Sequence, residues 1–152
     1  MNLAELETLC AEAARDLVER LPRPLPATVV LPLPTATQVT SLPDFPDDDA
    51  ARRALLARFA EDRMRPANAP CYGFIAEGTV GDPDAPTEVV VVVVGARRQP
   101  GRVTAAPLGP DGLGAFWPSE ELHPAAFPFL APLQEAADAA TPPDVTGGLL
   151  QT

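Results

Sequence analysis

The chain opens with apolar and polar positions that repeat with a helical period. Between Leu3 and Leu21, apolar residues recur at spacings of three and four and glutamates fall on another stripe. This pattern predicts an amphipathic helix with Asn2 as its N-cap. A second amphipathic helix is expected from Asp47 to about Met64. Asp47 is its predicted cap, because acidic side chains stabilise the first turn of a helix.

The segments between and after these helices have strand-like patterns. Residues 28–42 are extended, but Pro32 and Pro34 interrupt hydrogen bonding, so this stretch belongs at a sheet edge or divides into two short strands. A turn centred on Pro100 and Gly101 is typical of type II. Three later strands are expected to form an antiparallel meander: residues 71–80, 87–94 and 102–108.

Six consecutive valines, residues 89–94, form the middle strand of this meander. A strand with one face in water alternates apolar and polar residues, and this one does not. If the preceding hairpin loop is centred on residues 81–86, Phe74 pairs near Val93 and Ile75 near Val92. Both faces of the strand are therefore predicted to be covered.

The two helices are expected to lie together on one face of the sheet. Two alternatives stay open for the other face. The first is residues 116–130, an aromatic and proline-interrupted segment that contains Trp117 and precedes a short helix near Pro132. The second is another copy of the chain, which gives a two-fold homodimer.

These elements predict the α+β class. We expect an antiparallel sheet of about four to five strands with two amphipathic helices on one face, in the order α-β(β)-α-β-β-β-(short α). Residues 1–140 form a single domain and residues 141–152 a flexible tail. The element order resembles the profilin-like, roadblock and longin scaffolds, and also small acidic secretion chaperones. That resemblance implies a domain that binds other proteins or dimerises.

Composition narrows the functional classes. The chain has 152 residues, 46% hydrophobic and 21% charged, with a formal net charge of −10. Strong negative charge argues against a general nucleic-acid binder and against adhesion to anionic membranes. Residues 1–21 lack the basic start of a signal peptide, so a cytoplasmic protein is expected. Cys10 and Cys71 are then reduced thiols, and neither a metal nor a cofactor is predicted.

A few polar residues are candidates for binding. Arg97, Arg98 and Arg102 form the one basic cluster, at a hairpin tip, where they bind a phosphate or an acidic partner or only keep the turn soluble. Glu77 and Glu88 lie at the ends of neighbouring strands. Paired carboxylates carry acid/base chemistry in some enzymes, although strand-end acids are more often simply solvated.

Catalytic motifs are weak, because His123 is the only histidine and no nucleophile elbow or phosphate-binding loop is present. The sequence therefore favours a non-enzymatic protein-interaction module, an adaptor or chaperone-like protein that acts through an apolar surface. The alternative is a small-molecule-binding domain or small enzyme, with a pocket between the sheet and residues 116–130 and with Glu77 as a polar contact. Trp117 is a further candidate contact residue for either function.

Overall fold

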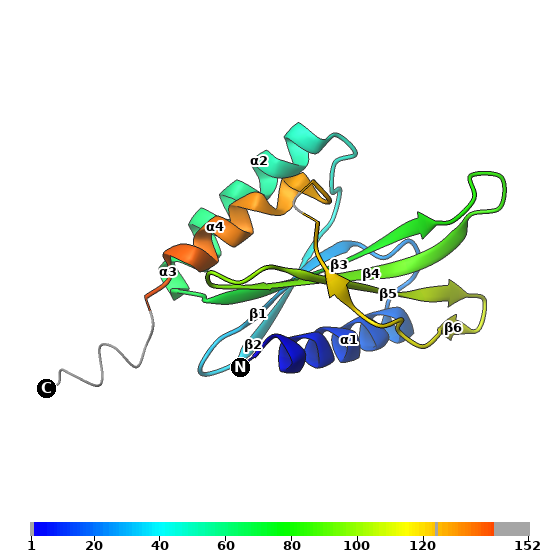
Figure 1. The fold of residues 1–152 in the computed structure, drawn as a ribbon, viewed down its shortest axis with the longest axis horizontal. Helices are drawn as coiled ribbons and strands as arrows, with labels where there is room; N and C mark the ends of the chain where they lie inside the picture. The colour runs from blue at the N-terminus through cyan, green and yellow to red at the C-terminus, as the bar shows by residue number, and fades with distance from the viewer. Residues whose placement is uncertain (1, 124, 142–152) are drawn as a thin grey trace, which may run out of the picture.

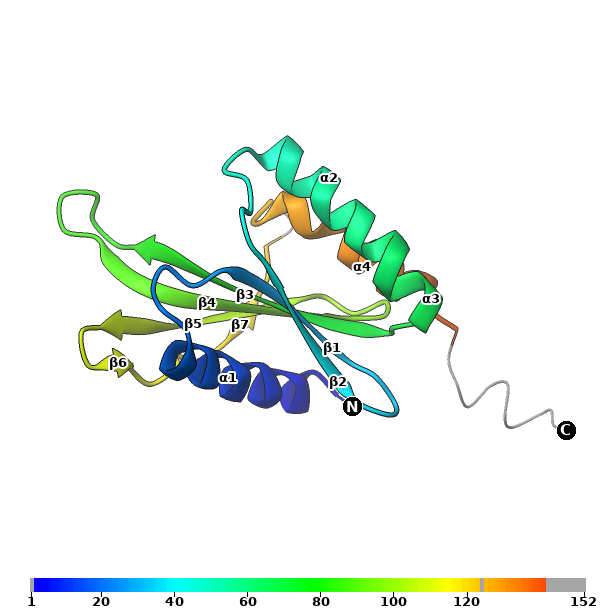
Figure 2. The same ribbon diagram turned by 180° about the vertical axis from the view of Figure 1, so that it is seen from behind.

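The α+β class is confirmed. The computed structural model describes residues 2–123 and 125–141, and in it a curled antiparallel sheet carries helices on both faces (Figure 1, Figure 2). The helical elements are α1 (Leu3–Arg20), α2 (Asp49–Phe59), the π-helical turn η1 (Ala60–Met64), α3 (Arg65–Ala67), the 3-10 turn η2 (Pro128–Leu130) and α4 (Ala131–Ala139). The strands are β1 (Ala27–Pro32), β2 (Thr37–Leu42), β3 (Cys71–Val80), β4 (Thr87–Ala96), β5 (Arg102–Gly109), β6 (Gly112–Leu113) and β7 (Glu120–Glu121). Their order in the sheet is β2-β1-β3-β4-β5-β6, and β7 also pairs with β5.

The start of each long helix is fixed by a side-chain cap. The Asn2 side chain accepts the N–H of Glu5 at 2.8 Å, and the Glu5 carboxylate accepts the N–H of Asn2 at 2.9 Å, which completes a capping box. The predicted cap of the second helix is wrong by one residue. Asp48, not Asp47, accepts the N–H of Ala51, at 2.8 Å. The helix begins at Asp49, so Asp48 is the residue with the extended N-cap backbone from which a side chain reaches the N–H three positions on.

Residues 28–42 divide into two strands, as the prolines predict. Pro32 ends β1 and Pro34 lies in the connecting turn, which is closed by a 3.0 Å hydrogen bond from the N–H of Leu33 to the C=O of Ala36. β2 is the outermost strand on this side of the sheet. The prolines thus lie where no ladder hydrogen bond needs their missing N–H.

The register of the valine strand is also confirmed. Phe74 pairs with Val93 and Ile75 with Val92. The predicted placement of both helices on one face is wrong. α1 packs on the face that carries Val92, and α2 and α4 pack on the face that carries Val93 (Figure 1). Each amphipathic helix has one apolar stripe, so a strand that is apolar on both faces needs a helix on each.

The aromatic segment forms part of an interrupted edge strand and also supplies side chains that cover the sheet. β6, β7 and the N–H of Trp117, which donates to the C=O of Ala105 at 2.9 Å, follow β5 along its outer edge. The chain then crosses from one face to the other. Phe116 packs on the α1 side, whereas Phe129 packs on the α2 side. The buried valines are thus covered within the chain and give no reason for a dimer through this strand.

The turn between β4 and β5 closes earlier than predicted. Its hydrogen bond runs from the N–H of Gln99 to the C=O of Ala96 at 3.1 Å, so the turn is not centred on Pro100. Arg98 adopts a left-handed φ of 57°. Its N–H donates to the Asp138 carboxylate at 2.7 Å. This tertiary contact with α4 holds the turn in place at a residue that ordinarily avoids the conformation.

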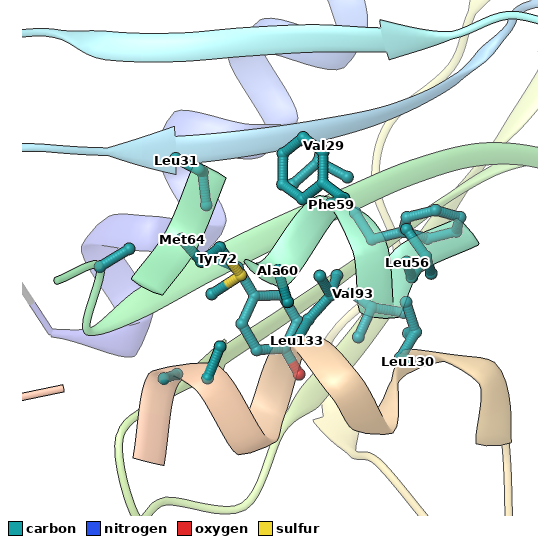
Figure 3. Packing of buried hydrophobic residues seen from close by; sticks show 14 of the residues in the cluster. Val29, Leu31, Leu56, Phe59, Ala60, Met64, Tyr72, Val93, Leu130 and Leu133 are labelled. Carbon is teal, nitrogen blue, oxygen red and sulfur yellow. The ribbon is translucent and has the colours of Figure 1, made fainter. Parts of the chain in front are cut away.

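The larger core lies between the sheet and the α2–α4 layer. Figure 3 shows Leu56 and Phe59 of α2 and Leu133 of α4 facing Val29 and Val93 of the sheet. Fully burying a side chain of this size stabilises the fold by about 1.5–3 kcal/mol. Beyond α4, Thr141 exchanges hydrogen bonds with the Asn68 side chain, and the rest of the predicted tail lies outside the described residues.

Candidate functional site

An apolar groove of about 700 Å³ lies on the α2 side of the sheet, at the end of β3 that points away from α3. The face of the sheet is left uncovered here, because α2 and α4 pack over its other half (Figure 2). Four parts of the chain form the walls: residues 24–27 before β1, residues 42–45 before α2, residues 74–80 of β3 with Val91 of β4, and the phenylalanines at 127 and 129.

The floor of the groove is apolar and its aromatic wall is a cluster of rings in mutual contact. Ala76 and Val91 are half-buried neighbours on β3 and β4. The ring centroid of Phe74 lies 5.8 Å from those of Phe45 and Phe129, in tilted and edge-to-face arrangements. Such contacts add about 0.5–1.5 kcal/mol each beyond simple burial. The aromatic side chains therefore support one another and leave the hollow beside them open.

Arg52 supplies a fixed cation at one end of the groove. Its guanidinium carbon lies 5.4 Å from the ring centroid of Phe45 and 5.2 Å from that of Phe129. Its Nε donates to a loop carbonyl at 2.5 Å. The carboxylates of Asp47 and Asp49 lie 4.0 and 3.9 Å from its terminal nitrogens, beyond hydrogen-bonding distance. The terminal nitrogens of Arg52 therefore keep N–H donors for a ligand.

Glu77 lies on the opposite wall, and the structure does not make it half of a carboxylate pair. Its Oε2 accepts the N–H of Leu25 at 2.5 Å, whereas Glu88 forms an ion pair with Arg23. Each predicted carboxylate thus has its own partner in the loop before β1. Glu77 belongs to the groove, and Glu88 does not line it.

Among the described residues, no strand neighbours the edge of β3 beside the groove. The last pair between β1 and β3 joins Thr28 to Ile75, although β3 continues for five more residues. Hydrogen bonding alternates along an antiparallel strand, so the backbone groups of Glu77 and Thr79 point to the same side as those of Ile75. In the loop at 22–26 alternate residues are prolines, which have no N–H with which to extend the ladder.

The predicted basic cluster is engaged in tertiary structure at two of its three positions. The Nε of Arg97 donates to the C=O of Ala140 at 2.8 Å. Arg102 donates to the carbonyl of Ser119 at 2.8 Å and to its hydroxyl at 3.1 Å. Arg98 is exposed at the turn. The structure therefore does not bring the three guanidinium groups onto one shared partner.

Trp117 is placed away from the groove. Its side chain is 45% exposed on the edge of β5, and its C=O accepts the hydroxyl of Thr104 at 2.5 Å. The interactions that hold this residue are thus backbone interactions. Trp117 stays a candidate contact residue of a different surface, separate from the wall that contains Glu77.

A smaller hollow of about 370 Å³ lies between the β4–β5 turn and α4. At its base the hydroxyl of Tyr72 donates to Oε1 of Gln134 at 3.0 Å, and Nε2 of Gln134 donates to the C=O of Ala96 at 2.9 Å. Burial raises the pKa of Tyr72 above its ordinary value, with the Asp138 charge acting in the same direction. This buried network joins α4 to the sheet, and His123 is exposed at its rim.

The two cysteines are buried free thiols between α1 and the sheet, Cys10 on the helix and Cys71 on β3. Burial, with smaller contributions from Cys71 and Glu7, raises the pKa of Cys10 to about 12. A Cβ atom at Gly73 would lie 2.2 Å from the Cys10 sulfur, so glycine allows α1 to pack closely on β3. Within residues 2–123 and 125–141, no cluster of three or more metal-ligating side chains occurs.

Sequence reasoning missed Arg52 and Phe45. Arg52 is on the second helix, outside the apolar face predicted there, and only the folded chain brings it against two aromatic rings that also contact each other. Phe45 did carry a signal, because it is a single aromatic residue between prolines in a polar loop. An apolar side chain in such a loop indicates a docking position that short-range periodicity does not reveal.

No protein-family model, curated protein or solved structure matches the chain. Across the part of the chain that the structure describes, no helix is both long and apolar enough to cross a membrane.

Proposed function

We propose that the protein is a binding module that holds an extended, apolar segment of another protein in the groove along β3. The observation that carries this proposal is the combination of an apolar floor with an unpaired strand edge. A peptide that adds to a sheet edge gains backbone hydrogen bonds, and its alternate side chains enter the adjacent hollow. Glu77 and Thr79 offer the edge, and Ala76 and Val91 the floor.

The charges around the groove restrict which peptide segments it can bind. Two aspartates, Asp44 and Asp47, line it beside one arginine, Arg52, and Glu77 lines it as part of the β3 edge. The whole chain has a net charge of −10. An acidic peptide is therefore repelled at the rim, and a neutral or basic apolar segment is preferred.

A second candidate function is the binding of a small apolar molecule. The groove volume of about 700 Å³ supports it, because pockets for such ligands span roughly 300–1,000 Å³ and have mainly apolar walls with a few polar groups. Arg52, Asp44 and Asp47 are those polar groups here. Both candidate functions place the ligand in the groove. They differ because only a peptide forms backbone hydrogen bonds with the open edge of β3.

Peptide display against the immobilised protein tests the proposal, with a groove-filling variant as the comparison. Ala76→Trp places an indole on the floor, whereas Ala67→Trp makes the same change at an exposed site on α3. We expect wild type and Ala67→Trp to enrich the same apolar, neutral or basic peptides, and Ala76→Trp to lose them. Enrichment that survives in Ala76→Trp contradicts the proposal, as does no enrichment by wild type.

Native mass spectrometry of the three proteins tests the second candidate. A bound small molecule that is retained by wild type and Ala67→Trp but lost from Ala76→Trp favours the small-molecule function. Circular dichroism confirms that each variant is folded before any binding result is interpreted.

A further inference from the structure

The outer edge of β2 is a second unpaired strand edge, and it is separate from the groove. Within residues 2–123 and 125–141, β2 pairs with β1 on one side and with no strand on the other. Leu33 and Ala36 form a hydrogen-bonded pair in the same register as the pairs of β1 and β2. Hydrogen-bonded pairs alternate with non-hydrogen-bonded pairs along an antiparallel ladder, so every second residue pair counted from Leu33–Ala36 is hydrogen-bonded. The backbone groups of the intervening residues, Thr37, Val39 and Ser41, therefore point away from β1, toward the open edge.

This edge lacks the features that commonly prevent strand pairing. Residues 37–42 read TQVTSL, with no charged residue and no proline. Val39 is 47% exposed on it. Threonine and valine favour strands, and natural edge strands are usually blunted by charge, proline, a bulge or a covering segment. The other edge of the sheet, along β5, has a covering segment, because residues 112–122 follow it.

We propose that β2 pairs antiparallel with β2 of a second copy of this chain, around a two-fold axis at Val39. In this register Val39 faces the partner's Val39, and Thr37 faces the partner's Ser41. These are the residues whose backbone groups point outward, so each facing pair exchanges two hydrogen bonds. In a two-fold interface each contact occurs twice with the two chains exchanged. Here Thr37 faces the partner's Ser41 at both ends, and only Val39, on the axis, faces its own copy.

The charges near β2 favour a second copy of this chain as the partner, rather than a strongly charged protein. The strand is neutral although each chain carries a net charge of −10. The nearest cation is Arg63, which donates to Gln38 at 3.3 Å and to Thr40 at 3.5 Å over one face of the strand. Since two acidic chains repel each other at long range, added salt should strengthen the pairing rather than weaken it.

Sedimentation velocity on the full chain, from low to high micromolar concentration and at low and high salt, tests this interface. Val39→Asp places two carboxylates opposite each other across the axis. Val80→Asp makes the same change at a site that is 39% exposed, at the other end of the sheet. We expect wild type and Val80→Asp to dimerise, more strongly at high salt. Val39→Asp should weaken dimerisation by at least about tenfold.

A third variant covers the case in which Val39→Asp fails to fold. Val39→Pro adds no charge and removes only an outward N–H, which an edge strand tolerates. It should also weaken dimerisation by about tenfold or more. Wild type that stays monomeric at high micromolar concentration and high salt overturns the proposal. A dimer that is unchanged in the folded Val39 variants overturns it as well.

Discussion

The same substitution at two adjacent valines of β4 should lower the stability of the protein by very different amounts. Val92 is 1% exposed beneath α1. Val92→Asp forgoes about 1.5 kcal/mol or more of burial. It also buries a carboxylate with no partner, which costs at least about 3 kcal/mol more. The sum, roughly 5 kcal/mol, is comparable with the whole stability of a small domain. We therefore expect Val92→Asp to be unfolded or close to it.

Val91→Asp should leave the protein folded. Val91 is half-buried at the floor of the groove, so its carboxylate stays in contact with water. The expected loss is only about 1 kcal/mol, within the usual range for a single substitution. Its effect should instead appear in binding, because it places a charge where an apolar side chain is expected to sit.

Urea denaturation followed by circular dichroism measures both variants against wild type. Peptides that wild type enriches then give the affinity of the folded Val91→Asp variant. Two folded variants of equal stability would refute the placement of α1 over Val92. A Val91→Asp variant that unfolds as completely as Val92→Asp would refute the open groove.

Three further predictions follow from individual contacts. Asp48→Ala removes the cap of α2 and should destabilise the protein by about 1 kcal/mol, whereas Asp47→Ala, with the same charge change, should have almost no effect in urea denaturation. Burial raises the pKa of Cys10 from an ordinary value of 9.0 to about 12, so its contribution to stability is complete below pH 9 and is lost as the pH rises from 9 toward 12. The free energy of unfolding should fall there by up to about 1.4 kcal/mol per pH unit, and a flat profile would contradict the burial of this thiol. Arg102→Ser should lower the free energy of unfolding by about 1 kcal/mol through its lost hydrogen bonds, and Arg98→Ser by less than about 0.5 kcal/mol; equal losses would contradict the difference between these sites.

The long patterned elements were predictable because their signals are local. The helical stripe of α1 and the cap at Asn2 need only neighbouring residues. The register of β4 follows from the hairpin loop and the apolar content of both faces. Pro32 and Pro34 divided the first strand region at the correct place, since a missing N–H acts within the segment itself.

The sidedness of the helices and the groove depend on contacts that are distant in sequence. An amphipathic stripe shows that the apolar side of a helix must pack against something. It does not show which face of the sheet that side packs against. The β4–β5 turn is displaced because Arg98 bonds to Asp138 on α4. The groove combines four separate segments, and Arg52 reaches its place beside the rings of Phe45 and Phe129 only through tertiary packing.

Amide hydrogen exchange, measured by NMR on the protein with and without a peptide that wild type enriches, tests the proposed function most directly. We expect the exchange of the Glu77 and Thr79 amides to slow when the peptide binds, because their N–H groups become bonded to the added strand. The outward amide of Val39 on β2 should be unaffected by the peptide at a protein concentration where the chain is monomeric. Unchanged exchange at both Glu77 and Thr79 in a saturated complex would contradict strand addition at β3.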